Sequence, residues 1–227
     1  MTTDTPTPAA PHVSVRGEAH LDVEPEIARI DITLTARDTD RATTLDRLTH
    51  RNAHILDLTR SYGEAVEKLE TGAFSIAPET ARHGRGDRIR AYQGRVRLTA
   101  ELNDFTALGE LTTRLADQEA TRIDGPWWAL RPDSPAYAEA RRLAVHDAVQ
   151  RARAYSTALG TTLAALLELS DTGLLPPPTT LRGNRMAFAA ATADEPTDEP
   201  TPLDLEPRRQ TVTADVTARF TMHPPTL

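Results

Sequence analysis

The 227-residue chain contains no cysteine, a single lysine (Lys68) and few aromatic residues, which make up 4% of the total. Without cysteine the chain forms neither disulfide bonds nor thiolate metal sites, and it has no thiol nucleophile. It also lacks an uninterrupted apolar run of about 18 residues, which excludes a transmembrane helix. These absences indicate a globular protein whose function does not use thiol chemistry.

Acidic residues outnumber basic ones, 33 to 26, which gives a formal net charge of −7. A protein that binds DNA or RNA along its phosphates needs a surplus of lysine and arginine, and an anionic membrane surface attracts the same residues. The charge balance therefore predicts no nucleic-acid partner and no binding to a membrane surface.

The first eleven residues are rich in threonine and proline and carry one charged side chain, Asp4. They have neither the basic start nor the apolar centre of a secretory signal peptide. We therefore expect residues 1–11 to be disordered and the protein to be cytoplasmic.

Alternating apolar residues predict seven strands, and capping residues mark three helices between them. The expected strands cover about residues 12–21, 26–37, 66–77, 88–102, 121–130, 164–171 and 210–222. The expected helices cover about residues 41–62, 105–116 and 135–159.

Two of these helices carry a stripe of residues that we expect to face a sheet. In the helix 41–62 the stripe is Leu45, Leu48, Ile55, Leu56 and Thr59. In the helix 135–159 it is Tyr137, Ala140, Ala144, Ala148, Ala152, Tyr155 and Leu159. The small alanines of the second stripe indicate close packing of that helix on a sheet.

The order of the elements over residues 26–131 is β-α-β-β-α-β, which is the order of a ferredoxin-like unit. Residues 12–25, 132–175 and 208–222 are expected to form a second small α+β subdomain around it. The predicted fold class is therefore α+β, with a ferredoxin-like βαββαβ unit interleaved with this second subdomain.

Residues 176–207 differ from the rest of the chain, because they contain seven prolines and six acidic residues. A stretch of this length without regular structure is uncommon inside a compact domain. We expect it to form a mobile loop.

Five local strings, in this order along the chain, resemble one bacterial family. The strings are Val13–Ala19 with Pro25–Ile30, Arg90–Gln93, Gly125–Leu130, the alanine-rich helix from Glu139 to Gly160, and Met186–Ala187 with the ending Thr201–Met222. They are similar to the SIMPL-domain family, which includes periplasmic immunogenic proteins and oxidative-stress-defence-like proteins. Ala19 and Ala91 stand where the family usually has glycine, and Glu26 stands where it has aspartate.

The resemblance implies a SIMPL-like domain over residues 12–222 but no reaction. The family has no established catalytic residues, so none is carried over to this chain. It is associated with envelope or oxidative-stress phenotypes and, in places, with self-assembly into oligomers.

His50 and His54 are four residues apart on a predicted helix, a spacing that presents two imidazoles to one metal ion. Both lie opposite the apolar stripe, however, and Arg51 occupies the position of the glutamate in His-Glu-x-x-His enzymes. The sequence also has no Gly-x-Ser-x-Gly motif and no glycine-rich phosphate loop. We therefore expect no metal, no cofactor and no catalytic residue.

Four arginines surround a turn-prone, glycine-containing segment between two strands: Arg82, Arg85, Arg88 and Arg90. Guanidinium groups gathered in this way bind an anion or an acidic partner. The alternative is an ordinary solvated hairpin loop.

Trp127 and Trp128 are adjacent on a predicted strand, so their side chains point to opposite faces of the sheet. Trp128 takes the buried aromatic position of the family. Trp127 then either anchors an interface with another molecule or covers part of its own chain.

Two hypotheses follow for the function. The first is a non-enzymatic SIMPL-like protein that associates with itself, as a scaffold or binding module, through its strand edges. The alternative is a protein that binds a small anionic ligand, or an uncharacterised enzyme, with its site in the cleft between the two subdomains.

Overall fold

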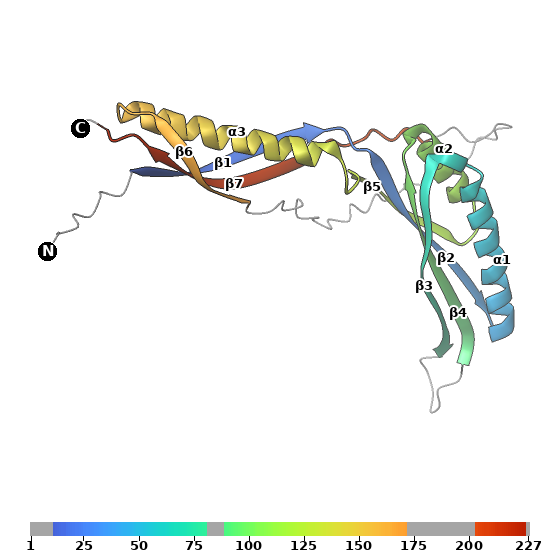
Figure 1. Cartoon of the computed structure of the whole chain (residues 1–227). Coiled ribbons are helices and arrows are strands. Elements are labelled where there is room, and N and C mark those ends of the chain that lie inside the picture. The colour runs from blue at the N-terminus through green and yellow to red at the C-terminus, as the bar shows by residue number, and fades with distance from the viewer. Residues whose placement is uncertain (1–10, 81–88, 172–202, 226–227) are drawn as a thin grey trace, which may run out of the picture. The chain divides into compact units, whose positions relative to one another are not determined.

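The computed structural model describes residues 11–80, 89–171 and 203–225, which form three α-helices and seven strands (Figure 1). The chain is an α+β protein, as predicted. Residues 1–10, and residues 176–202 of the expected mobile loop, lie outside the described residues. The described chain divides into two compact units. Of the described residues, unit 1 contains 11–23, 132–171 and 210–225, and unit 2 contains 24–80, 89–131 and 203–209.

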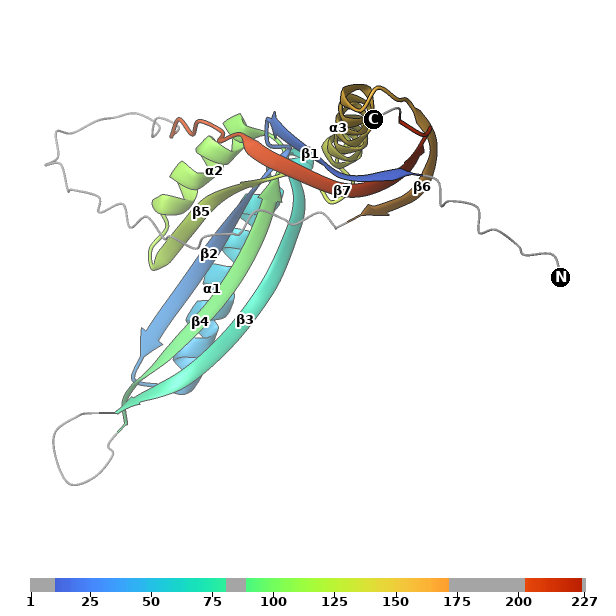
Figure 2. The same cartoon turned by 90° about the vertical axis from the view of Figure 1, so that its left-hand side faces the viewer.

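Unit 1 is a three-stranded antiparallel sheet with one helix on it. Its strands are β1 (His12–Val23), β6 (Leu163–Asp171) and β7 (Gln210–Met222), in the spatial order β1-β7-β6, and its helix is α3 (Pro135–Ala158). The last strand of the chain therefore lies at the centre of this sheet, between the first strand and the sixth. Helix α3 lies on one face of this sheet (Figure 2). It packs along β1 and β7 and makes few contacts with β6.

The face of α3 that lies on the sheet consists of small residues at a spacing of four: Ala140, Ala144, Ala148, Ala152 and Ser156. The predicted alanine face is confirmed. Tyr155 and Leu159, which were expected at its end, are exposed instead. A row of residues spaced by four winds around the helix by about 40° at each step, so by the end of α3 the buried row has turned away from these two side chains.

Unit 2 is a four-stranded antiparallel sheet with two helices on one face (Figure 1). Its elements are β2 (Ile27–Asp38), α1 (Arg41–Arg60), β3 (Val66–Thr80), β4 (Ile89–Leu102), α2 (Phe105–Ala116) and β5 (Thr121–Ala129). The element order β-α-β-β-α-β is the predicted one, and the strands lie in the order β3-β4-β2-β5. A single turn of 3-10 helix (Gly63–Ala65) joins α1 to β3. The ferredoxin-like assignment itself stays a prediction.

Helix α1 buries a different set of residues from the expected stripe. Thr44, Leu48, Ile55 and Thr59 are buried, whereas Leu45 is 43% exposed. Leu45 lies 100° further around the helix than Thr44. The Thr44 hydroxyl donates a hydrogen bond of 2.8 Å to the carbonyl oxygen of Asp40, which satisfies its polar group in the core.

Residues 203–209 form an extended segment that lies on α2. The Leu203 N–H donates to the hydroxyl of Thr113 at 3.0 Å, and Leu205 packs against the core of unit 2. A Cβ atom on Gly109 would be 2.3 Å from the carbonyl oxygen of Leu203, so only glycine leaves room for this segment. Residues 203–207 belong to the expected loop 176–207, and here they are held by α2.

Candidate functional site

The two histidines of α1 are exposed and do not face a common metal position. His50 Nδ1 lies 2.8 Å from the carbonyl oxygen of Asp46, and His54 Nε2 lies 3.1 Å from Oε1 of Gln118. Each ring therefore donates to a separate acceptor. Among the described residues, no group of three or more His, Asp or Glu side chains is placed to hold a metal ion.

Of the four arginines expected to bind an anion, Arg82, Arg85 and Arg88 lie outside the described residues. Arg90 is exposed near the start of β4 and makes no ion pair with a residue that the structure describes. Anion binding at this hairpin stays a prediction.

The two tryptophans of β5 lie on opposite faces of the sheet of unit 2. Trp128 packs against the core and meets Phe105 edge-to-face, with ring centroids 4.8 Å apart. Trp127 is 41% exposed and lies opposite Arg29 of β2. A role for Trp127 as an interface anchor stays a prediction.

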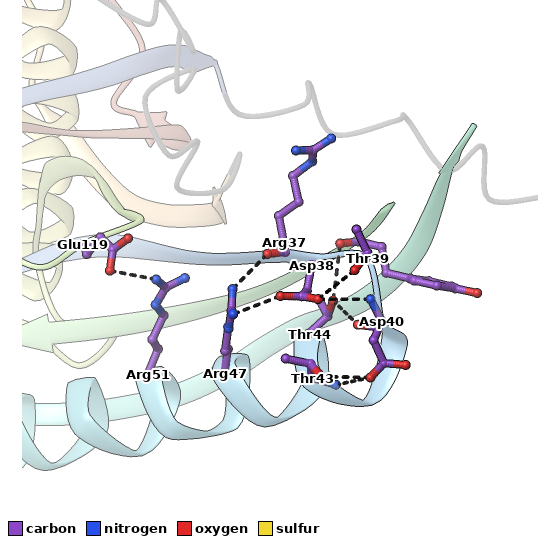
Figure 3. A network of polar contacts seen from close by, with 10 residues as sticks. Arg37, Asp38, Thr39, Asp40, Thr43, Thr44, Arg47, Arg51 and Glu119 are labelled. Atoms are coloured by element: carbon purple, nitrogen blue, oxygen red, sulfur yellow. Dashed lines mark hydrogen bonds and ion pairs between the residues drawn. The ribbon is translucent and has the colours of Figure 1, made fainter. Parts of the chain in front are cut away.

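A network of polar residues holds the start of α1 against β2 (Figure 3). Asp40 caps the helix by accepting from the N–H and hydroxyl of Thr43 at 2.8 and 3.0 Å. Asp38 accepts from the N–H of Asp40 and pairs with Arg47 at 2.9 Å. These backbone N–H groups hold the pKa of both carboxyls below their ordinary values.

Further along α1, Arg51 joins the helix to the sheet (Figure 3). Its guanidinium donates to the carbonyl oxygen of Thr35 at 2.7 Å and pairs with Glu119 at 3.0 Å. Arg51 is therefore a structural residue of this helix, which accounts for an arginine beside the two histidines.

A second polar cluster joins the start of β3 to the end of β5. Glu67 accepts from the guanidinium of Arg131 and, at 2.8 Å, from the side-chain amide of Asn103. These two donors hold the pKa of Glu67 below its ordinary value, the arginine with the larger effect. The Arg131 N–H also donates to Glu26 at 2.9 Å.

Four described carboxyl groups, Asp38, Asp40, Glu67 and Glu139, each have a pKa below the ordinary value. A general acid at neutral pH needs a pKa raised toward 7. These four carboxyls instead stay ionised and act as hydrogen-bond acceptors in ion pairs or helix caps.

Unit 1 has an open groove of about 520 Å³ between the second half of α3 and β6. Its apolar lining includes Val149, Leu163, Leu166 and Phe220. Arg153 is the one charged side chain in the lining, and it makes no ion pair with a described residue.

Strand β6 exposes three leucines, one of which, Leu166, also lines the groove. Leu166 and Leu169 lie opposite Phe220 and Ala218 of β7, whose side chains are buried. Directly opposed residues point to the same face of a sheet, so both leucines lie on the face that carries α3. Because α3 does not cover β6, they are 53% and 47% exposed. Leu167, beside them, is exposed as well. We call Leu166 and Leu169 the open strip.

Sequence reasoning predicted β6 as a strand but missed the open strip. The run Leu-Ala-Ala-Leu-Leu-Glu-Leu is typical of a buried strand. The signal available in the sequence was that this apolar run contains no lysine, arginine or proline, which protect exposed strands.

The family model SIMPL, described as a protein of unknown function (DUF541), matches residues 13–220. The chain belongs to the SIMPL family. The SIMPL match runs from β1 to β7, so it covers both units, and the family description assigns no activity to either. No curated protein matches the chain. In the described part of this SIMPL chain, no helix has the length and apolar character needed to cross a membrane.

Proposed function

We propose that this SIMPL chain is a non-enzymatic protein that associates with itself and serves as a scaffold or binding module. The observation that supports this function is the open strip of β6, in which Leu166 and Leu169 are exposed on one face of the sheet. Exposed apolar patches on folded domains mark surfaces that bind other molecules. The polar clusters of unit 2, by contrast, have structural partners.

The free energy available from these leucines sets the strength of association to expect. Burying the exposed half of one leucine contributes about 1 kcal/mol, so the four leucines of two open strips contribute about 4 kcal/mol. Association itself costs about 4–15 kcal/mol in lost freedom of motion. The leucines therefore support a weak association that depends on concentration and needs further contacts.

The test is the molar mass in solution, measured by light scattering after size exclusion from about 1 µM to about 1 mM. This range covers binding free energies of about −8 to −4 kcal/mol. We expect the mass of wild type to rise above one chain, and Leu166→Ser to reduce it. Leu45→Ser is the matched control, because Leu45 is an exposed leucine of unit 2. A mass of one chain throughout the range would overturn the proposal.

The alternative function is binding of a small anionic ligand, and one observation favours it. The groove of unit 1 combines apolar lining with Arg153, which forms no ion pair with any residue in the described part of the chain. A panel of anionic metabolites, screened by thermal shift on wild type and on Arg153→Gln, tests it. Stabilisation of wild type alone would support ligand binding, and an unmoved melting temperature across the panel would exclude it for those compounds. A cytoplasmic location and a stress or envelope role stay predictions.

A further inference from the structure

We infer that unit 1 binds a single fatty acid molecule, with its carboxylate on Arg153 in the groove and its acyl chain along the open strip of β6. This inference rests on the alternative function above, the binding of a small anionic ligand, and it names the chemical class of that ligand. It follows from three features of unit 1: the charge of the groove, the separation of its polar and apolar side chains, and its continuity with the open strip.

The first feature is the charge of the groove. Arg153 is the one charged residue in the lining, and it forms no ion pair with any residue in the described part of the chain. A guanidinium group binds a carboxylate through charge-assisted hydrogen bonds. One cation matches one anionic group, whereas a polyanion such as a nucleic acid needs a row of cations. The charge of the groove therefore selects a ligand with a single anionic group.

The second feature is the arrangement of the lining. The threonine hydroxyls come from the end of α3 and the turn into β6, at Thr157, Thr161 and Thr162. Val149 lies on α3 about 12 Å from Thr157, at the rise of a helix, and Arg153 lies midway between them. The groove therefore has an end with hydroxyl groups, a cation at its centre and an apolar end. An amphipathic anion has the same sequence of polar and apolar parts.

The third feature is the continuity of the groove with the open strip. Leu166 belongs to both, and Leu169 continues the apolar surface for about 10 Å further along β6, away from the turn. An extended acyl chain advances about 1.3 Å per carbon, because its bonds of about 1.5 Å zigzag. A chain of about eight carbons therefore reaches from Leu166 to Leu169.

These features favour a fatty acid over other anionic occupants. A hydrophilic anion such as phosphate would leave Leu166 and Leu169 exposed. An anionic membrane surface repels a chain with a net charge of −7. A fatty acid pairs with Arg153 and covers both leucines. Since the same leucines support the proposed self-association, the bound fatty acid competes with a second copy.

The test is a titration with fatty acids of increasing length, from hexanoate to dodecanoate, followed by the amide NMR spectrum of the nitrogen-labelled full chain. The pH is about 8, where the carboxylate is ionised, and each fatty acid stays below the concentration at which it forms micelles. The protein concentration is one at which light scattering gives the mass of one chain, so that a second copy does not compete.

We expect the peak shifts to be confined to unit 1, around residues 149–157 and 163–169. The dissociation constant should fall about fourfold for each two carbons added up to decanoate, because an open groove buries about half of each methylene group. Beyond decanoate the gain should level off, since the open strip ends at Leu169.

Substitutions of Arg153 test the contact with the carboxylate. Arg153→Gln should raise the dissociation constant of dodecanoate about tenfold, because it removes a charge-assisted hydrogen bond. Arg153→Lys keeps the positive charge and should retain most of the affinity. Arg90→Gln is the matched control, because it changes an exposed arginine of unit 2 that makes no ion pair with a described residue. It should leave the dissociation constant unchanged.

Leu169→Ser tests the contact with the acyl chain. It should weaken the binding of dodecanoate and leave that of hexanoate nearly unchanged, because the shorter chain does not reach Leu169. Leu45→Ser, at an exposed leucine of unit 2, should alter neither. The amide spectrum of each variant shows whether it is folded. If Leu169→Ser does not fold, the comparison of Arg153→Gln with Arg153→Lys decides.

The outcomes separate this inference from the function on which it rests. If a hydrophilic anion of the metabolite panel binds through Arg153 and dodecanoate does not, the fatty acid is excluded and anion binding stands. If neither dodecanoate nor any compound of the panel binds, both are overturned. Three other results also overturn the inference: an affinity that does not depend on chain length, equal peak shifts in unit 2, or binding to phosphatidylglycerol vesicles without binding to free dodecanoate.

Discussion

A Cβ atom on Gly17 would lie 2.1 Å from the carbonyl oxygen of Ala144, so β1 and α3 meet backbone to backbone at this point. No residue with a side chain fits this separation. The contact holds α3 over β1, which is separated from β6 by β7 in the sheet. The leucines of β6 are exposed because the only helix of the described part of unit 1 is fixed above the other edge of the sheet.

Gly17→Ala should therefore destabilise unit 1. The added methyl group would meet the Ala144 oxygen and also Ala148, whose Cβ atom lies 2.7 Å away. Overpacking of this kind costs about 1–3 kcal/mol of stability. We expect a loss at the upper end of this range, because the nearest atom belongs to the backbone of α3. Chemical denaturation measures the loss. Gly72→Ala is the control, because its Cβ atom would be 3.5 Å from the nearest atom, an ordinary contact. Equal stability of Gly17→Ala and wild type would contradict the contact.

Gly109→Ala should release residues 203–209 from α2. Alanine improves the helix by about 1 kcal/mol, but its Cβ atom would lie 2.3 Å from the Leu203 carbonyl oxygen, so the segment must move. Faster hydrogen exchange over residues 203–209, with α2 itself still protected, is the expected result. Thr113→Val removes the acceptor of the Leu203 N–H and should give a similar but smaller increase. Unchanged exchange in both variants would show that the segment is held elsewhere.

Asp104 caps α2 by accepting from the N–H groups of Thr106 and Ala107 at 2.9 and 3.1 Å. Asp104→Ala leaves both donors without this acceptor and should lower the free energy of unfolding by about 1 kcal/mol. Asp104→Asn keeps a side-chain oxygen and should retain most of the stability. Denaturation curves of the two variants compare them directly, and an equal loss in both would show that capping is not the cause.

The stability of unit 2 should fall in acid through Glu67. Arg131 and Asn103 hold the pKa of Glu67 below 4.5, its ordinary value in an unfolded chain. A lowered carboxyl pKa stabilises the fold above the unfolded value, and this contribution is lost as the pH falls through the folded pKa. Glu67→Gln should therefore be less stable than wild type at pH 7, with the difference shrinking below about pH 4.5.

The control for this pH dependence is Glu110→Gln, which changes an exposed glutamate of α2 that makes no ion pair with a described residue. The stability of Glu110→Gln should match that of wild type both at pH 7 and below about pH 4.5. If the difference in stability between Glu67→Gln and wild type is as large in acid as at pH 7, the charge of Glu67 is not the cause of that difference.

Local patterns in the sequence predicted much of the fold. Alternation identified the strands, and the helices predicted to begin at residues 41 and 105 begin there as α1 and α2, because alternation and capping both depend on neighbours in the sequence. The errors at Leu45, Tyr155 and Leu159 arose where the burial of a helical residue depends on how the helix crosses its sheet.

The candidate surface could not be predicted in the same way. The exposure of Leu166 and Leu169 depends on where α3 lies over the sheet. That position is set by the close approach of Gly17 to Ala144, two residues that are more than a hundred positions apart in the sequence. The apolar composition of β6 is compatible with a buried strand and with an exposed one. Only the position of the helix distinguishes them.

The molar mass of wild type in solution, measured by light scattering across a concentration series, tests the central claim most directly. Self-association through β6 predicts a mass that rises from 24.8 kDa, the mass of one chain, toward twice that value. It also predicts that the rise is weakened in Leu166→Ser and unchanged in Leu45→Ser. A mass that stays at one chain up to about 1 mM, where the binding free energy is about −4 kcal/mol, would contradict it.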